Sequence, residues 1–217
     1  MSWELDHVFF ATSEPGALAR ELVELGVALT PHRTHAGQGT TNTSAMFENA
    51  YFEILWAHDR NELRSEIVQP LGLDERIRWR ETGACPIGLC FRPSDLASAP
   101  ATWPFATWRF KPAYVTVGDG IPIVTPPRCL NEPVLFVSTW PRSVAAHEHR
   151  GARRTLTGIQ LSRPASSSAM SPGFEWLVKS SLVSVSDGPG YFLELEWDHG
   201  RQGEVHDLSA APIRIRG

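Results

Sequence analysis

The sequence lacks long hydrophobic runs and has little excess of charge of either sign. No stretch approaches the roughly 20 consecutive apolar residues that a membrane helix needs, so we expect no membrane partner. The formal net charge is −4 and the pI about 6.1, which predicts no basic surface for nucleic acid. No charged segment followed by an apolar one opens the chain, so we expect no secretory signal.

Cysteine is scarce as well. Cys85, Cys90 and Cys129 form an odd number and lack the spacing of a metal site. We expect free thiols in a reducing compartment, which predicts a cytoplasmic protein. The sequence also lacks the Gly-x-Ser-x-Gly elbow of a serine hydrolase and the lysine of a phosphate-binding loop. We expect no organic cofactor.

Apolar and aromatic residues are plentiful. The 217 residues are 42% hydrophobic and include ten Phe and eight Trp. This is enough apolar material for one large domain, or for two small ones that share a core.

The first quarter of the chain has the clearest pattern. Residues 5–11 are predicted to form a strand. Ser13 is expected to cap the following helix, and Pro15 suits its first turn. Leucines at 18, 22 and 25 give that helix an apolar stripe, and Gly26 ends it. Further strands are predicted at residues 27–32, 43–47 and 50–56. The order is β-α-β-β-β.

The last of these strands belongs to an internal repeat. The segment YFEILW at 51–56 reappears as YFLELEW at 191–197, which aligns Glu53 with Glu194. A middle copy at 134–140 places Val137 where the glutamates stand.

The strands that open each unit also correspond. Residues 5–10, 86–91 and 156–161 align His7 with Gly88 and Gly158. The predicted divisions are a first βαβββ module (1–57), a helical connection (58–83), a second, divergent module (84–141), a third, abbreviated module (154–199) and a tail (200–217). The predicted fold class is α+β, in which repeated βαβββ modules form a curved, half-open mixed β-barrel with helices on its convex side.

His7 and Glu53 are the main candidates for chemistry. Period-two alternation turns both away from the face that packs under the helix. A carboxylate among apolar residues is costly to bury unless it is paired, protonated or bound to a metal. Imidazole and carboxylate can bind Zn, Mn, Ni or Fe, or can act as an acid/base pair. A purely structural His–Glu contact is the alternative.

The loop at residues 34–42 is the second candidate. Gly37 and Gly39 permit tight turns, while Thr40 and Asn42 offer a hydroxyl and an amide to a ligand. A hairpin loop with its polar groups satisfied internally explains the same residues equally well.

These segments together resemble the vicinal oxygen chelate superfamily, and within it the glyoxalase-like domain proteins. The resemblance rests on Leu-Asp-His-Val at 5–8, on His-x-Gly-x-Gly-Thr-x-Asn at 35–42 and on Tyr-x-Glu at 51–53. It implies paired βαβββ units around a ligand cavity. It also implies that a first-strand His and a last-strand Glu of each unit bind a divalent metal. His7 and Glu53 match those positions, whereas Gly88 and Val137 do not.

Three functions follow from this resemblance and from the residues. The first is a glyoxalase-like protein that binds a small oxygenated metabolite, a metal-dependent lyase or isomerase with His7 and Glu53 as metal ligands. Its catalytic candidates are Glu53 and Glu194, and its ligand-binding candidates are His7, His35, Thr40, Asn42 and Tyr51. The second is a metal-free protein that binds or sequesters a small molecule. The third is an assembly protein whose barrel is filled by side chains. A homodimer is left open.

Overall fold

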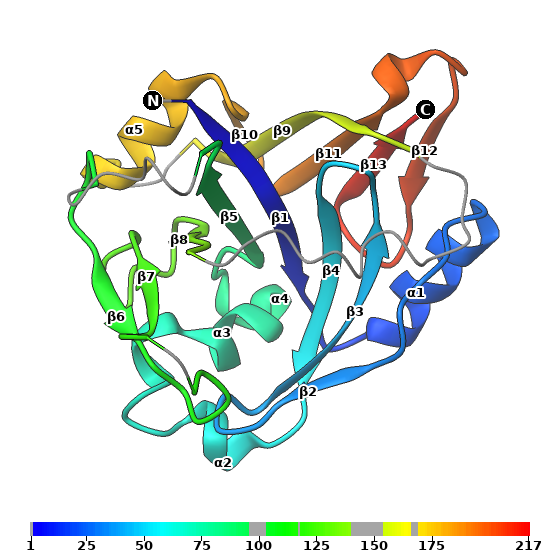
Figure 1. The fold of residues 1–217 in the computed structure, drawn as a ribbon. Helices are drawn as coiled ribbons and strands as arrows, with labels where there is room; N and C mark the ends of the chain where they lie inside the picture. The colour runs from blue at the N-terminus through cyan, green and yellow to red at the C-terminus, as the bar shows by residue number, and fades with distance from the viewer. Residues whose placement is uncertain (1, 96–102, 117, 140–153, 166–168) are drawn as a thin grey trace.

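The computed structural model describes residues 2–95, 103–116, 118–139, 154–165 and 169–217. Its larger sheet has eight strands in the order β2-β3-β4-β1-β5-β8-β7-β6 and curls into a half-barrel. A second sheet has five strands in the order β10-β9-β11-β13-β12 (Figure 1). The predicted α+β class with a curved mixed sheet is confirmed.

The first unit supplies half of the larger sheet. Its elements are β1 (Trp3–Ala11), α1 (Pro15–Glu24), β2 (Arg33–His35), β3 (Thr40–Met46) and β4 (Tyr51–Ala57). β1 runs parallel to β4, and β3 pairs antiparallel with both β4 and β2. This is the predicted βαβββ order.

Two local expectations for the first unit were wrong. The strand expected at 27–32 is reduced to one bridge between Leu29 and Ala45, and β2 starts later. Pro31 lies in that segment and cannot donate to a ladder, which explains the interruption. The residue before α1 is Glu14, and no side chain caps the helix. Gly26 does follow the helix with a positive φ of 75°.

The second unit repeats the pairing of the first. It consists of β5 (Ile87–Pro93), β6 (Trp108–Phe110), β7 (Ile121–Ile123) and β8 (Val134–Val137). β5 is parallel to β8, and β7 is antiparallel to its two neighbours. β1 and β5 pair antiparallel and join the two units into one sheet.

The connection between the units is helical, as predicted. It contains α2 (Arg60–Leu63), η1 (Gln69–Leu71), α3 (Leu73–Ile77) and α4 (Trp79–Thr82). The buried guanidinium of Arg76 donates to four backbone carbonyls, which belong to Leu71, Cys85, Cys129 and Glu132. In Figure 1, α3 lies between the two arms of the curled sheet.

The last third of the chain forms the second sheet and two short helices. These are β9 (Leu156–Pro164), α5 (Pro172–Ser180), β10 (Ser184–Gly188), β11 (Phe192–Trp197), η3 (Asp198–Gly200), β12 (Val205–Leu208) and β13 (Ile213–Arg216). β10 pairs directly with β9, whereas β2 does not pair with β1. Within the segment expected to be a tail, β13 lies between β11 and β12.

Successive side chains of a strand point to opposite faces of the sheet, so the apolar residues form two clusters, one on each face. Val8, Phe10, Phe52 and Ile54 join the cluster that includes α1, α5 and the inner face of the second sheet. Phe9 and Leu55 belong to a cluster on the other face, with residues of α3, β6 and β7. The larger sheet therefore has its convex face covered by helices and by the second sheet. Its concave face carries the second cluster, to which α3 contributes, and the cavity of the site.

Candidate functional site

A cavity of about 490 Å³ opens on the concave face of the larger sheet. His7, His35, Asn42, Tyr51 and Glu53 all line it. The barrel is therefore not filled by side chains, which contradicts the assembly protein among the three expected functions. Thr40 does not line the cavity, although we expected it to contact a ligand.

Asp6 and His7 both face the cavity, although they are consecutive in β1. Strict alternation would place them on opposite faces. The register between β1 and β5 shifts between Leu5 and His7, and such a bulge can bring two neighbours to the same face. Asp6 could not be predicted as a cavity residue, because no residue in this segment predicts the bulge.

The imidazole of His7 is held by Asp6 and by Tyr51. Its Nδ1 donates to Asp6 Oδ1 at 2.6 Å, and Asp6 in turn forms an ion pair with Arg92. The ring stacks on Tyr51, with ring centroids 4.2 Å apart and planes at 13°. Burial lowers the pKa of His7 to about 4, although the charge of Glu53 opposes the shift. His7 is therefore neutral at neutral pH, and its Nε2 carries a free lone pair.

Glu53 faces this lone pair from β4. Its Oε1 accepts a short hydrogen bond from the side-chain amide of Asn42, and its Oε2 lies 3.7 Å from His7 Nε2. Only 6% of Glu53 is exposed. Two atoms that both offer electron pairs thus face each other at a separation too long for a hydrogen bond.

This spacing fits a shared divalent ion. Zinc bonds to histidine nitrogen and carboxylate oxygen are about 2.0–2.2 Å, so two ligand atoms 3.7 Å apart can both reach one ion. Asp6 behind His7, and Asn42 behind Glu53, are the outer partners that orient metal ligands in proteins. The donor set of His7 and Glu53 therefore fits a metal.

Cys90 lies beside the same histidine. It pairs with His7 across the β1–β5 ladder, and ligand atoms of Asp6, His7 and Cys90 lie within 4.8 Å of one another. Burial holds the pKa of the Cys90 thiol well above its usual value, so the free thiol is protonated and a poor nucleophile. The sequence predicted a free thiol at Cys90, but not its place beside His7.

The positions of the second unit that correspond to His7 and Glu53 carry no ligand. The alignment of the opening strands matches Gly88 with His7; His7 pairs with Tyr51 in the first unit, and Gly88 pairs with Val134 in the second. The same register aligns Glu53 with Phe136. The predicted match of Val137 to Glu53 was wrong by one residue, because it relied on the position of Trp140, outside the described residues.

The Gly88 position is filled by a side chain of the first unit. A Cβ placed on Gly88 would lie 2.0 Å from the ring of Phe9. Phe136 packs edge-on against His7 with ring centroids 5.2 Å apart, and it also contacts Phe9. Two aromatic rings thus stand where a second pair of ligands would be.

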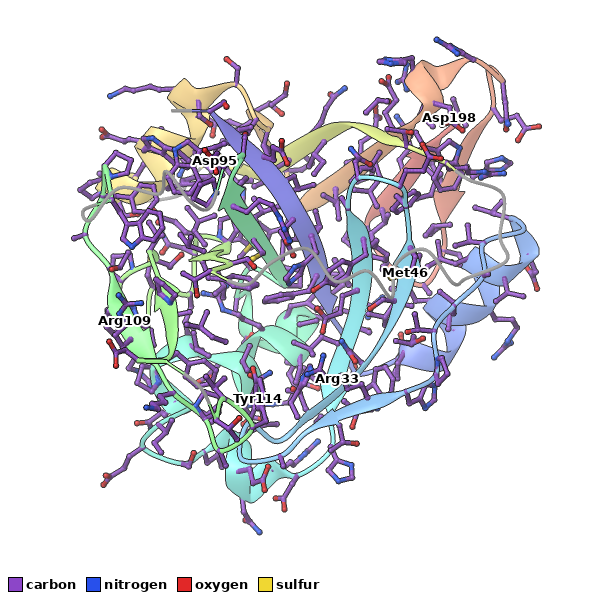
Figure 2. The ribbon with its side chains drawn as sticks, viewed as in Figure 1. Arg33, Met46, Asp95, Arg109, Tyr114 and Asp198 are labelled. Atoms are coloured by element: carbon purple, nitrogen blue, oxygen red, sulfur yellow. The ribbon has the colours of Figure 1, made fainter. Side chains whose placement is uncertain are left out.

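His35 belongs to a polar network at the lower end of the cavity. His35 Nδ1 lies 3.1 Å from Thr40 Oγ1, to which Gln38 donates at 2.7 Å, and the Tyr114 hydroxyl donates to Gln38. Burial lowers the pKa of His35. Arg33 and Tyr114 line the same part of the cavity (Figure 2).

The glycine-containing loop is held by the protein itself. The backbone amides of Gly37 and Gly39 both donate to Glu62 Oε2, at 2.8 and 2.9 Å. A Cβ on Gly39 would lie 2.3 Å from the carbonyl oxygen of Asp59. These glycines therefore allow close packing on the start of α2, which favours the hairpin interpretation for this part of the loop.

Glu194 lies apart from the cavity. It belongs to β11 in the second sheet, accepts a hydrogen bond from Gln160 at 3.2 Å and pairs with Arg216 and Arg214 at 3.2 and 3.8 Å. The structure does not bring it together with His7 and Glu53. The repeat placed it on a corresponding strand, but that strand is in another sheet.

Residues 5–119 match the family described as the Glyoxalase-like domain, which covers more than half of the chain. The chain belongs to this family, and the resemblance stated from its sequence is confirmed at that level. No curated protein matches the chain. No helix among the described residues is long and apolar enough to cross a membrane.

One solved structure has a similar fold, and two others match with lower scores. A hypothetical protein from Staphylococcus aureus matches with a TM-score of 0.58 and 9% identity over 99% of each chain. A hypothetical protein from Bacillus halodurans matches with a TM-score of 0.42 and 14% sequence identity, over 66% of this chain and 99% of that one. A mutant 4-hydroxymandelate synthase from Streptomyces coelicolor matches with a TM-score of 0.44 and 11% sequence identity, over 89% of this chain and 70% of that one.

Proposed function

We propose that this chain is a cytoplasmic lyase or isomerase of glyoxalase type, which binds a small oxygenated metabolite beside a divalent metal ion. His7 and Glu53 would hold the ion. The observation that carries the proposal is the 3.7 Å separation of His7 Nε2 and Glu53 Oε2, two electron-pair donors that face each other. A bound divalent metal supplies Lewis acidity, which polarises a substrate oxygen.

The neighbours of these two residues orient them before any ligand arrives. Asp6 keeps a proton on Nδ1 of His7 and so leaves Nε2 free to bind. Asn42 fixes one oxygen of Glu53 and directs the other toward His7. Tyr51 holds the plane of the imidazole by stacking. This arrangement is preorganised, because the side chains need little rearrangement on binding.

The shape of the cavity suggests how a ligand lies in it. The polar groups gather around His7, Glu53 and the His35 network. An apolar part of the wall includes Phe9, Leu71, Phe110, Val115, Ile121 and Ile123, and further polar groups come from Glu48, Asn49, Thr116 and Ser138. A ligand with an oxygen-bearing head and an apolar body would suit both parts. The apolar wall would also exclude water from the reacting end.

A second candidate function is metal-free binding or sequestration of the same kind of molecule. The loss of ligand residues at Gly88 and Phe136 favours it, since two side chains make a small ligand set for a tightly held ion. In that case Glu53 and Asn42 would act as polar anchors, and no reaction would follow.

Metal analysis of protein purified without chelators tests the proposal. We expect stoichiometric Zn, Mn, Ni or Fe in the wild-type chain and its loss in His7→Ala. His58→Ala is the matched control, because His58 is exposed and does not line the cavity, and it should retain the metal. Absence of metal in the wild-type chain, even after reconstitution, would overturn the metal-dependent function and leave the second candidate.

A further inference from the structure

We propose that Arg33 makes the cavity selective for ligands that carry a carboxylate. Its guanidinium would bind the carboxylate, while a second oxygen of the ligand lies at His7 and Glu53. Such a ligand belongs to the small oxygenated molecules of the proposed function, on which this inference rests. Arg33 lies in β2, lines the cavity near Tyr114 and is exposed to solvent there (Figure 2).

The strand pairing puts Arg33 on the concave face of the larger sheet. Arg33 is directly opposite Asn42 in the antiparallel ladder of β2 and β3, so the two side chains share a face, with Cβ atoms about 4.5–5.5 Å apart. Asn42 donates to Glu53 in the cavity. The position of Arg33 over the cavity therefore agrees with the register that places Asn42 beside Glu53.

Arg33 and Glu53 are separated by about the length of a small ligand. Two strand spacings lie between β2 and β4, roughly 10 Å in total, and the register offsets the two residues by roughly 7 Å along the strands. The curl of the sheet brings their side chains closer, but the basic group that Glu53 meets is His7, not Arg33. A molecule of several atoms can thus reach both groups at once.

The guanidinium of Arg33 has no fixed partner in the described part of the chain. No hydrogen bond or ion pair with another described residue engages it. Arg92, the other arginine among the described residues of the cavity wall, is paired with Asp6. Arg33 therefore offers its N–H donors in a planar fork, the shape that binds a carboxylate through two parallel hydrogen bonds.

The charge of Arg33 acts on side chains inside the cavity. Burial lowers the pKa of His35, Glu53 opposes this shift and Arg33 adds to it. Burial and the charge of Glu53 raise the pKa of Tyr114, and Arg33 opposes them. Both effects of Arg33 are those of a nearby positive charge, which would also attract an anion that enters this end of the cavity.

A carboxylate suits this part of the wall better than a phosphate. The described residues of the wall include no lysine, and Arg33 offers a single fork, which matches one carboxylate. Glu48, an acidic residue of the same wall, follows the end of β3, whereas Arg33 pairs with Asn42 near the start of that strand. Glu48 therefore lies at the opposite end of β3 and leaves the guanidinium to a ligand.

Three related probes separate the two ends of the ligand. 4-Oxo-4-phenylbutanoate has an apolar ring, a ketone oxygen and a carboxylate. Its amide, 4-oxo-4-phenylbutanamide, lacks the charge, and 4-phenylbutanoate lacks the ketone. Isothermal titration calorimetry measures their affinities for the full-length chain, purified without chelators, as wild type, Arg33→Gln and Arg20→Gln. Arg20 is the matched control, because it is an exposed arginine of α1 that does not line the cavity. Circular dichroism verifies that each variant is folded.

We expect the wild type to bind the keto acid more tightly than its amide. Arg33→Gln should weaken the binding of the keto acid by about 10- to 100-fold, the range of a hydrogen bond to a charged group, and leave that of the amide unchanged. Arg20→Gln should bind all three probes as the wild type does.

Equal affinity of the wild type for the keto acid and its amide, or no binding of either, overturns the role of Arg33. An equal loss for both probes in Arg33→Gln also overturns it, because that result means a structural role. Equal binding of 4-phenylbutanoate and the keto acid, with the loss in Arg33→Gln intact, supports Arg33 and counts instead against recognition of an oxygen at His7 and Glu53.

Discussion

The neutral state of His7 predicts a specific dependence of stability on pH. Burial lowers its pKa from 6.5 to about 4 in the folded chain. The unfolded chain therefore binds a proton at a higher pH than the folded chain does. Between pH 6.5 and 4 the unfolded state holds more protons, so the free energy of unfolding falls as the pH is lowered through this window.

The size of the effect follows from the two pKa values. Lowering the pH from 8 to 4.5 should cost about 2–3 kcal/mol of stability through His7 alone. Other groups titrate in this range too, so the effect is isolated by comparison with His7→Gln, which has no imidazole. The loss on acidification should be smaller in His7→Gln than in the wild-type chain by that amount.

Urea denaturation at several pH values measures the difference, in the presence of a chelator so that no metal binds His7. His58→Gln is the control, because that side chain is exposed, and its pH dependence should follow the wild type. Equal pH dependence in wild type and His7→Gln would refute the reasoning, because it would mean that His7 titrates normally in the folded chain.

Two further changes test the packing around the site by thermal and urea denaturation. Gly88→Ala should destabilise the chain by about 1–3 kcal/mol, because the new Cβ would overlap the ring of Phe9, whereas Gly16→Ala, with open space around it, should not destabilise it. A Gly88→Ala variant as stable as the wild type would contradict the close contact. Arg76→Met should cost about 3–5 kcal/mol, since four backbone carbonyls lose their donor in the interior. Unchanged stability would mean that water or other groups replace the guanidinium.

The sequence predicted those features that depend on alternation within a strand. Phe52 and Ile54 do pack with α1, and Glu53 does face the cavity with His7. Alternation is a property of a single strand, so the face of each side chain can be predicted without knowing the neighbouring strands. The same reasoning failed for Asp6, because a bulge depends on how β1 pairs with β5 and leaves no mark in the residues of β1 alone.

Features that depend on which strands pair could not be predicted from the repeat. Glu194 was aligned with Glu53 by a shared motif, yet β11 belongs to a second sheet and its glutamate is neutralised by Arg214 and Arg216. Phe136 takes the position of Glu53 in the second unit because the β5–β8 register sets it. A motif of six residues identifies similar strands, but it does not specify their partners.

The two units of the half-barrel differ in a complementary way. The first unit contributes the polar pair and its supports, His7 with Asp6 and Glu53 with Asn42. The second unit contributes Phe136 and the apolar strands β6 and β7. Because Gly88 admits the Phe9 ring, the place of a second ligand pair becomes part of a hydrophobic wall. A cavity with one polar side and one apolar side can orient an asymmetric molecule, since its oxygen-bearing end has only one favourable place to lie.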